Sequence, residues 1–224
     1  MIAFIGAMES EVQALVKMMS DVKHQVHRHL DFYIGTIAGK ECVVMKSGVA
    51  KIAAAMSTTV LLENFEVEIV VNIGTAGGLH PDMKVLDVVI AKQVTCHDLD
   101  VPGWEKGFDD EERCYYSDQK LLDVMHKITG DDQVWIGNMV TGDIFVCRDE
   151  QIKQIKKNYP NALCAEMEAA AIGQVCTHYQ KPFLVIRSLS DIAYQDNNQM
   201  TFYEYEVRAS ERSANWCVKF VEAI

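Results

Sequence analysis

Two glutamates interrupt an apolar segment and raise the first question about chemistry. Glu166 and Glu168 lie in the stretch NALCAEMEAAAIGQVC, residues 161–176, which is otherwise rich in alanine, isoleucine, valine and cysteine. A buried glutamate without a partner is costly. Either these carboxylates lie at a surface edge, or one of them meets a polar partner inside a pocket. Residues two apart on a helix point to different sides, so at most one would readily share a given pocket.

Three more polar residues follow short apolar runs. Glu11, Thr75 and Asp191 lie in or just after the sequences GAMESE, GTAGG and SD. Each has a purely structural explanation as well as a functional one. Glu11 would favour the positive end of a helix, and Asp191 would serve as a helix cap. Both interpretations stay open at the level of single residues.

Several common site motifs are missing from the sequence. GTAGG is not Gly-x-Gly-x-x-Gly, no Gly-Lys-Ser/Thr follows it, and no Gly-x-Ser-x-Gly is present. His24, His27 and His29 occupy a polar stretch, but no carboxylate or cysteine completes a recognisable metal-ligand pattern, so we expect a solvated surface there. His97 and Asp98 follow a predicted strand and are candidates for a supporting or interface role.

Composition narrows the class of protein. The chain has 224 residues, of which 49% are hydrophobic and 24% charged, and its formal net charge is −11. A protein with this negative charge lacks the basic surface that binds nucleic acid, so we expect a small neutral or zwitterionic ligand. Seven cysteines without Cys-x-x-Cys spacing argue against a disulfide framework or a zinc ribbon. The apolar run at the N-terminus is too short for a signal peptide or membrane span, so we expect a cytoplasmic protein with no membrane partner.

Hydrophobic periodicity predicts alternating strands and helices. The expected strands are Ile2–Gly6, Phe32–Ile37, Glu41–Lys46, Ile69–Ile73, Asp87–Val94, Gln133–Val140 and Pro182–Leu189. The expected helices are Ser10–Met19, Lys51–Phe65, Ser117–Ile128, Asp149–Asn158, Glu168–Tyr179 and Glu204–Val221. Residues Trp104–Arg113 are predicted to form an exposed loop.

This alternation predicts one α/β domain over residues 1–224, with a central sheet that is largely parallel or mixed. Ligands of open α/β sheets bind beyond the carboxyl ends of the strands. If the sheet brings three of these ends together, Glu11, Thr75 and Asp191 will face one crevice.

Five motifs in order resemble a known family. IGAMESEV, VVNIGTAGGL, TGDIFV, AEMEAAAIGQVC and VIRSLSDIA follow the order seen in bacterial 5'-methylthioadenosine/S-adenosylhomocysteine nucleosidases, which belong to the nucleoside phosphorylase superfamily. The resemblance spans nearly the whole chain. It implies a three-layer α/β/α sandwich, a homodimer, no metal or cofactor, and hydrolysis of the adenine–ribose bond of an adenosyl nucleoside. 5'-Methylthioadenosine, S-adenosylhomocysteine and 5'-deoxyadenosine are the candidate substrates.

The chemistry of that bond explains the residues that the resemblance assigns. Cleavage builds positive charge on the ribose and negative charge on the departing base, so it needs a general acid and a carboxylate that activates water. By the resemblance, Asp191 protonates N7 of adenine, helped by Ser190 and Arg187, and Glu11 acts on the water. Glu168 would accept hydrogen bonds from the 2' and 3' hydroxyls of the ribose.

The resemblance also assigns the walls of the site. Met167 would lie against the sugar, Phe145 would stack on the base, and the backbone of Val146 would read the edge of the base. The apolar wall around the sugar and the 5' substituent would consist of Met8, Val49 and Phe202.

Two departures from the family pattern bear on specificity. Thr75 stands where the family often has serine, which keeps the hydroxyl. The segment VPGWEKGFDDEERCYYSD, residues 101–118, is less typical, although in relatives this region helps form the pocket for the 5' substituent, partly across the dimer interface. Trp104 and Phe108 are candidates for that pocket, and an exposed loop is the alternative. Glu166 has no assigned role beyond a structural one.

Two rival functions remain on the sequence alone. A phosphorylase of the same fold would use phosphate in place of water, but GAMESE offers an acid and no arginine to bind it. A non-catalytic adenosine-binding module would not need Glu11, Glu168 and Asp191 together.

Overall fold

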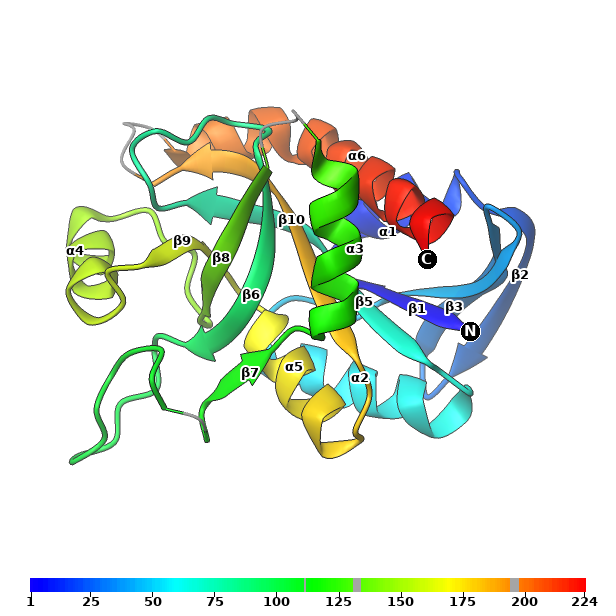
Figure 1. Ribbon diagram of the computed structural model, residues 1–224, viewed down its shortest axis with the longest axis horizontal. Helices are drawn as coiled ribbons and strands as arrows, with labels where there is room; N and C mark the ends of the chain where they lie inside the picture. Colours follow the sequence, from blue (N-terminus) through cyan, green and yellow to red (C-terminus); the bar gives the residue numbers. More distant parts are fainter. Residues whose placement is uncertain (111, 131–133, 194–197) are drawn as a thin grey trace.

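A computed structural model describes residues 1–110, 112–130, 134–193 and 198–224 (Figure 1). The strands are β1 Ile2–Gly6, β2 Ser20–His27, β3 Leu30–Ile37, β4 Lys40–Lys46, β5 Ile69–Gly78, β6 Val88–Cys96, β7 Cys114–Tyr116, β8 Val134–Thr141, β9 Ala162–Glu166 and β10 Phe183–Ile192. The helices are α1 Glu9–Val16, α2 Lys51–Asn64, α3 Gln119–Thr129, α4 Asp149–Asn158, α5 Ala169–His178 and α6 Asn198–Ala223.

The strands form one mixed sheet that partly closes on itself. Its order is β10-β6-β8-β9-β5-β1-β4-β3-β2, and β7 pairs with β6. Because β10 also pairs with β5, strands β5, β10, β6, β8 and β9 make a closed ring. β1 runs parallel to β4 and β5, whereas β10 is parallel to β5 and antiparallel to β6.

Helices cover both faces of the sheet and give the predicted three layers. Figure 1 shows α1 and α6 above the sheet and α2 and α5 below it. Successive residues of a strand point to opposite faces. Phe4 therefore shares a buried core with Trp216 of α6, whereas Ile5 shares the other core with Leu61 of α2 and Ile172 of α5. The expected α/β sandwich with a mixed central sheet is confirmed.

Most predicted elements are present, with shifted ends. The bounds of α4 are confirmed, and β3 and β4 pair antiparallel, whereas α1 ends three residues early and α6 begins at Asn198. The strands before GTAGG and SD continue to Gly78 and Ile192, because β5 and β10 pair in parallel along these residues. Thr75 and Asp191 thus lie within strands, and Asp191 is not a helix cap.

Sequence reasoning missed β2, β7 and β9. β2 contains His24 and His27 and is exposed at the sheet edge, so it lacks the apolar alternation that marks a half-buried strand. β9 ends at Glu166, and α5 begins only at Ala169. Glu166 and Glu168 therefore do not share a helix, and because both line the cavity described below, the expectation that at most one would share a pocket is wrong.

Candidate active site

A cavity of about 190 Å³ opens where β1, β5, β9 and β10 end. It is lined by Ala7, Met8, Glu11, Val49, Thr75, Ala76, Gly77, Ile144, Phe145, Val146, Ala165, Glu166, Met167, Glu168, Ser190, Asp191 and Phe202. Every residue that the resemblance assigned to the substrate site is in this set except Arg187, and the two further candidates Trp104 and Phe108 are outside it. The lining also includes Glu166, for which the sequence suggested only a structural or supporting role.

Glu11 is buried, and its carboxylate is held by backbone donors. One oxygen accepts hydrogen bonds from the N–H groups of Ala7 (2.7 Å) and Met8 (3.0 Å). The other accepts from the N–H of Thr75 at 2.9 Å, and the Thr75 hydroxyl lies 3.4 Å away. Burial raises the pKa of Glu11, while Arg187 and the N–H donors oppose that rise. The link between β1 and α1, together with Thr75 of β5, therefore fixes the orientation of this carboxylate.

Asp191 lies on β10 and is only 1% exposed. The Ser190 hydroxyl donates to its Oδ1 at 2.9 Å. The pairing of β10 with β5 shifts register between Leu189 and Asp191. Such a bulge interrupts the alternation of side chains, and both Ser190 and Asp191 consequently line the cavity.

Glu168 is the residue that precedes α5, and its Oε1 accepts from the N–H of Ala50 at 2.9 Å. Burial and the charge of Glu166 raise the pKa of Glu168 to about 8. The neighbouring Glu166 accepts from the N–H groups of Glu168 (2.9 Å) and Ala169 (2.8 Å). The Thr141 hydroxyl donates to its other oxygen. Glu166 therefore fixes the turn that presents Glu168 to the cavity.

Arg187 lies behind the acids and does not line the cavity. Its Nη2 donates to Glu166 Oε2 at 2.5 Å and to Asn72 Oδ1 at 2.7 Å, and its Nη1 donates to the carbonyl of Ile73 at 2.6 Å. Glu168 Oε2 lies 3.5 Å from Nη2. Although burial opposes its charge, the surrounding carboxylates keep the pKa of Arg187 above its usual value. The sequence prediction of Arg187 as a helper of Asp191 did not include this pairing with the glutamates.

Because Gly74 has no side chain, Arg187 and Glu11 can approach each other closely beside it. A Cβ atom at residue 74 would lie 2.5 Å from Glu11 Oε1 and 2.6 Å from Arg187 Nη1. Any side chain at this position would displace the two charged groups. The first glycine of GTAGG is therefore required by close packing, and no phosphate cradle is needed to explain it.

The remaining walls are apolar and aromatic. The rings of Phe145 and Phe202 meet edge to face with centroids 5.4 Å apart. Phe145 comes from the segment after β8 and Phe202 from α6. Val49 is half exposed at the rim. A flat apolar ligand can therefore be enclosed next to the three carboxylates.

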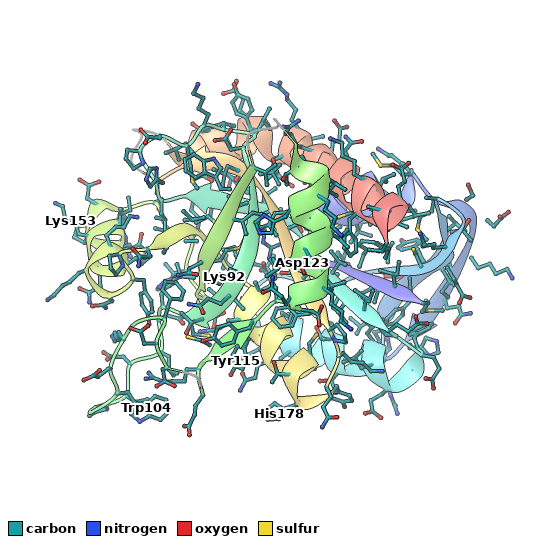
Figure 2. The ribbon with its side chains drawn as sticks, viewed as in Figure 1. Lys92, Trp104, Tyr115, Asp123, Lys153 and His178 are labelled. Carbon is teal, nitrogen blue, oxygen red and sulfur yellow. The ribbon has the colours of Figure 1, made fainter. Side chains whose placement is uncertain are left out.

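Among the described residues of the segment 101–118, none lines the cavity within one chain. Trp104 is half exposed, and the guanidinium of Arg113 lies 4.8 Å from its ring centroid. Figure 2 shows Trp104 on a loop that projects from the body of the molecule. Phe108 packs against Tyr159 with ring centroids 5.4 Å apart. Neither aromatic residue lines the cavity, so any contact with a 5' substituent would need a second chain.

Neither a metal site nor a membrane span is found among the residues that the structure describes. Within those residues, no group of three or more His, Cys, Asp or Glu side chains is arranged to hold a metal ion. No helix in the same part of the chain has the length and apolarity to cross a membrane.

Known proteins of one family match this chain over nearly its whole length. Residues 1–222 match the family model described as the phosphorylase superfamily. A 5'-methylthioadenosine/S-adenosylhomocysteine nucleosidase from Tolumonas auensis is 42% identical over 95% of both chains. The nucleosidase of the same name from Bacillus thuringiensis is 38% identical over 100% of this chain and 99% of its own.

Solved structures of the same kind superpose closely. The Streptococcus pneumoniae nucleosidase with the transition-state inhibitor MT-ImmA has a TM-score of 0.93 and 32% identity, covering 99% of this chain and 98% of its own. The Neisseria meningitidis nucleosidase in complex with methylthio-immucillin-A has a TM-score of 0.92 and 34% identity, covering 100% and 99%.

Proposed function

The chain belongs to the 5'-methylthioadenosine/S-adenosylhomocysteine nucleosidase family of the phosphorylase superfamily, and we propose how its residues release adenine from these two nucleosides. The enzyme is an N-glycosyl hydrolase. The observation that carries the proposed mechanism is that Glu11, Glu168 and Asp191, from distant parts of the chain, line one cavity. Three carboxylates match the three parts of the reaction, which are the base, the sugar and the attacking water.

Asp191 is the general acid that protonates N7 of adenine as the bond breaks. Its burial limits competition from water, and the Ser190 hydroxyl bound to Oδ1 holds the carboxyl in one orientation. Protonation neutralises the charge that builds on the departing base. A positioned proton transfer of this kind contributes roughly 10²–10⁴ in rate.

Glu11 orients and deprotonates the attacking water. Its carboxylate has little freedom to turn because three backbone N–H groups bind it. Each oxygen still has lone-pair capacity for a water molecule. The raised pKa of Glu11 makes it a stronger base than an exposed glutamate. These properties suit a general base at one fixed point.

Glu168 binds the 2' and 3' hydroxyls of the ribose through its carboxyl oxygens. Phe145 stacks on the base and the backbone of Val146 contacts its edge. Met167, Met8, Val49 and Phe202 enclose the sugar and the 5' substituent. Thr75 supports Glu11 through its N–H, and Arg187 supports the acids from behind.

We also propose a cytoplasmic homodimer without a cofactor. The seven cysteines are all free thiols, as expected in a reducing compartment. A dimer would bring a partner's segment to the open rim near Val49, where a 5' substituent would project. No contact with nucleic acid or membrane is proposed.

A product assay with and without phosphate tests the function. Purified protein is incubated with 5'-methylthioadenosine or S-adenosylhomocysteine, and adenine and sugar products are separated. We expect adenine with free methylthioribose from 5'-methylthioadenosine, and adenine with free S-ribosylhomocysteine from S-adenosylhomocysteine, each at the same rate with or without phosphate. A sugar phosphate would identify a phosphorylase, and binding without turnover would identify a non-catalytic module. Asp191→Asn protein purified in parallel controls for nucleosidase from the expression host.

A further inference from the structure

Three charged residues outside the cavity bind one another across its rim. The Lys51 ammonium donates to Asp98 Oδ1 at 2.5 Å and lies 3.7 Å from Asp143 Oδ2. Asp98 Oδ2 accepts from the N–H of Asp143 at 2.8 Å. Asp143 Oδ1 accepts from the N–H of Lys51 at 2.8 Å. Each residue thus contacts the other two, and we call this set the Lys51 cluster.

Two members of the Lys51 cluster adjoin different parts of the cavity, and the third connects the cluster to the sheet. Lys51 is the first residue of α2 and follows Ala50, whose N–H binds Glu168 on the ribose side. Asp143 directly precedes Ile144, Phe145 and Val146, which line the base side. Asp98 follows β6, the strand that pairs in parallel with β8. The cluster therefore joins the segment that carries the base wall to the segment that supports the ribose ligand.

Burial and neighbouring contacts restrict the movement of the two segments that the Lys51 cluster joins. The side chains of Lys51 and Asp98 are only 23% and 16% exposed, so solvent screens their attraction less than at an open surface. Although burial opposes it, the hydrogen bond from Lys51 lowers the pKa of Asp98. Below the cluster, the N–H of His97 binds the carbonyl of Thr141 at 2.8 Å. A side chain at Gly142 would overlap the His97 ring.

We propose that Lys51, Asp98 and Asp143 are positioning residues that set the separation between the base wall and the ribose ligand. This inference rests on the proposed function, because it assigns the two walls to the base and the sugar of one nucleoside. None of the three side chains lines the cavity. Their effect on the reaction is therefore exerted through the segment at 144–146 and through Ala50.

The proposal predicts a change in binding more than in chemistry. Asp191 and Glu11 are held by their own contacts with Ser190, Ala7, Met8 and Thr75, which the cluster does not touch. Lys51→Met and Asp98→Asn should each raise the KM for 5'-methylthioadenosine about tenfold and leave kcat within about threefold. The dissociation constant of adenine alone should rise by a similar factor. Lys51→Arg, which keeps the charge, should restore most of the affinity.

Hydrogen exchange of the ligand-free protein tests the structural part separately. Amides of residues 143–147 should exchange faster in Lys51→Met and Asp98→Asn than in the wild type. The matched control is Lys40→Met, which removes a partly buried lysine that donates to the carbonyl of Val221 at 2.8 Å, at the amino end of β4. It should change neither the exchange of residues 143–147 nor KM.

Several outcomes would overturn the proposal. These are unchanged exchange at 143–147 in both variants, faster exchange with unchanged KM and adenine affinity, or a fall in kcat at constant KM. Should Lys51→Met fail to fold, comparing the single variants Asp98→Asn and Lys51→Arg tests the same prediction. A wild-type protein without turnover would instead contradict the proposed function, and the exchange data would still decide whether the cluster holds the segment.

Discussion

Three of the four carboxylates that line the cavity, Glu11, Glu168 and Asp191, differ in how the fold holds them, and the differences match their proposed tasks. Glu11 has three backbone donors, which suit a base that must point at one water molecule. Asp191 has a hydroxyl donor on one oxygen, and Glu168 accepts a hydrogen bond from the N–H of Ala50. Each carboxylate thus keeps some capacity to accept or exchange a proton with a ligand.

Neutralising either proposed catalytic acid should nearly abolish turnover. We expect Asp191→Asn and Glu11→Gln each to lower kcat by roughly 10²–10⁴, because each removes one positioned proton transfer. Melting temperatures and circular dichroism should show that both variants fold. The control is Glu9→Gln, since Glu9 lies on the same helix but is exposed and binds Lys46. Wild-type kcat in either cavity variant would refute the role given to that residue.

The buried glutamates should make ligand-free stability depend on pH. The pKa of Glu168 is raised to about 8 and that of Glu11 is also raised, so the folded state binds more protons than the unfolded chain at neutral pH. The contribution of Glu168 is complete below the unfolded pKa of about 4.3 and is lost as pH rises through about 8. The contribution of Glu11 has the same sign, because its pKa is also raised. Glu168→Gln cannot ionise and should lose less stability over that range.

Melting curves between pH 6.5 and 9 measure this effect. The lower limit avoids His97, whose pKa is lowered by burial and which therefore destabilises the fold as pH falls below about 6.5. The wild-type melting temperature should fall by several degrees more than that of Glu168→Gln. Parallel curves for the two proteins would contradict a raised pKa at Glu168.

At the scale of elements, the junction of β9 and α5 depends on one ion pair. Glu166 binds the N–H groups of Glu168 and Ala169 and pairs with Arg187, and both charged side chains are 1% exposed. Glu166→Gln would leave the guanidinium without its full counter-charge. We expect a loss of about 3–5 kcal/mol in unfolding free energy. Urea denaturation measures it, and Glu9→Gln, which breaks an exposed pair, should cost less than about 1 kcal/mol. Equal losses in the two variants would count against this account.

Helices and strands were predicted correctly from the sequence where burial produces a clear hydrophobic periodicity. The apolar runs of β1, β5 and β10 and the amphipathic α4 were found, because their side chains alternate or repeat against a core. β2 was missed because it is exposed and polar. β9 was missed because it is short and ends in a carboxylate whose partner, Arg187, lies 21 residues away and is brought near only by tertiary contacts.

At the scale of the whole molecule, the site exists because distant segments end at one place. The parallel pairing of β1 with β5 and of β5 with β10 brings Glu11, Thr75 and Asp191 together, as the strand-end rule predicted. Glu168 arrives through β9, which closes the ring of strands and was not predicted. Residue types and motif order therefore indicated the members of the site, whereas the Arg187 pairings and the Lys51 cluster required the fold.

Apolar side chains near the cavity rim support the proposed dimer. Ile52 and Met56 lie one turn apart on α2 and are 84% and 54% exposed. Exposed apolar groups of this kind favour a protein contact. We expect the wild type to sediment as a dimer and Ile52→Glu to shift it toward monomer. Val26→Glu, at an exposed valine of β2, is the control and should stay dimeric. A monomeric wild type, or an unchanged Ile52→Glu, would disprove this interface.

A crystal structure with methylthio-immucillin-A tests the central claim most directly, because one ligand reports on all three carboxylates. We predict that Asp191 lies within about 2.6–3.2 Å of purine N7, that Glu168 binds the ribose-like hydroxyls at similar distances, and that Glu11 contacts a water molecule beside the sugar-like ring. An inhibitor bound with N7 turned away from Asp191, or with its hydroxyls out of reach of Glu168, would contradict the account.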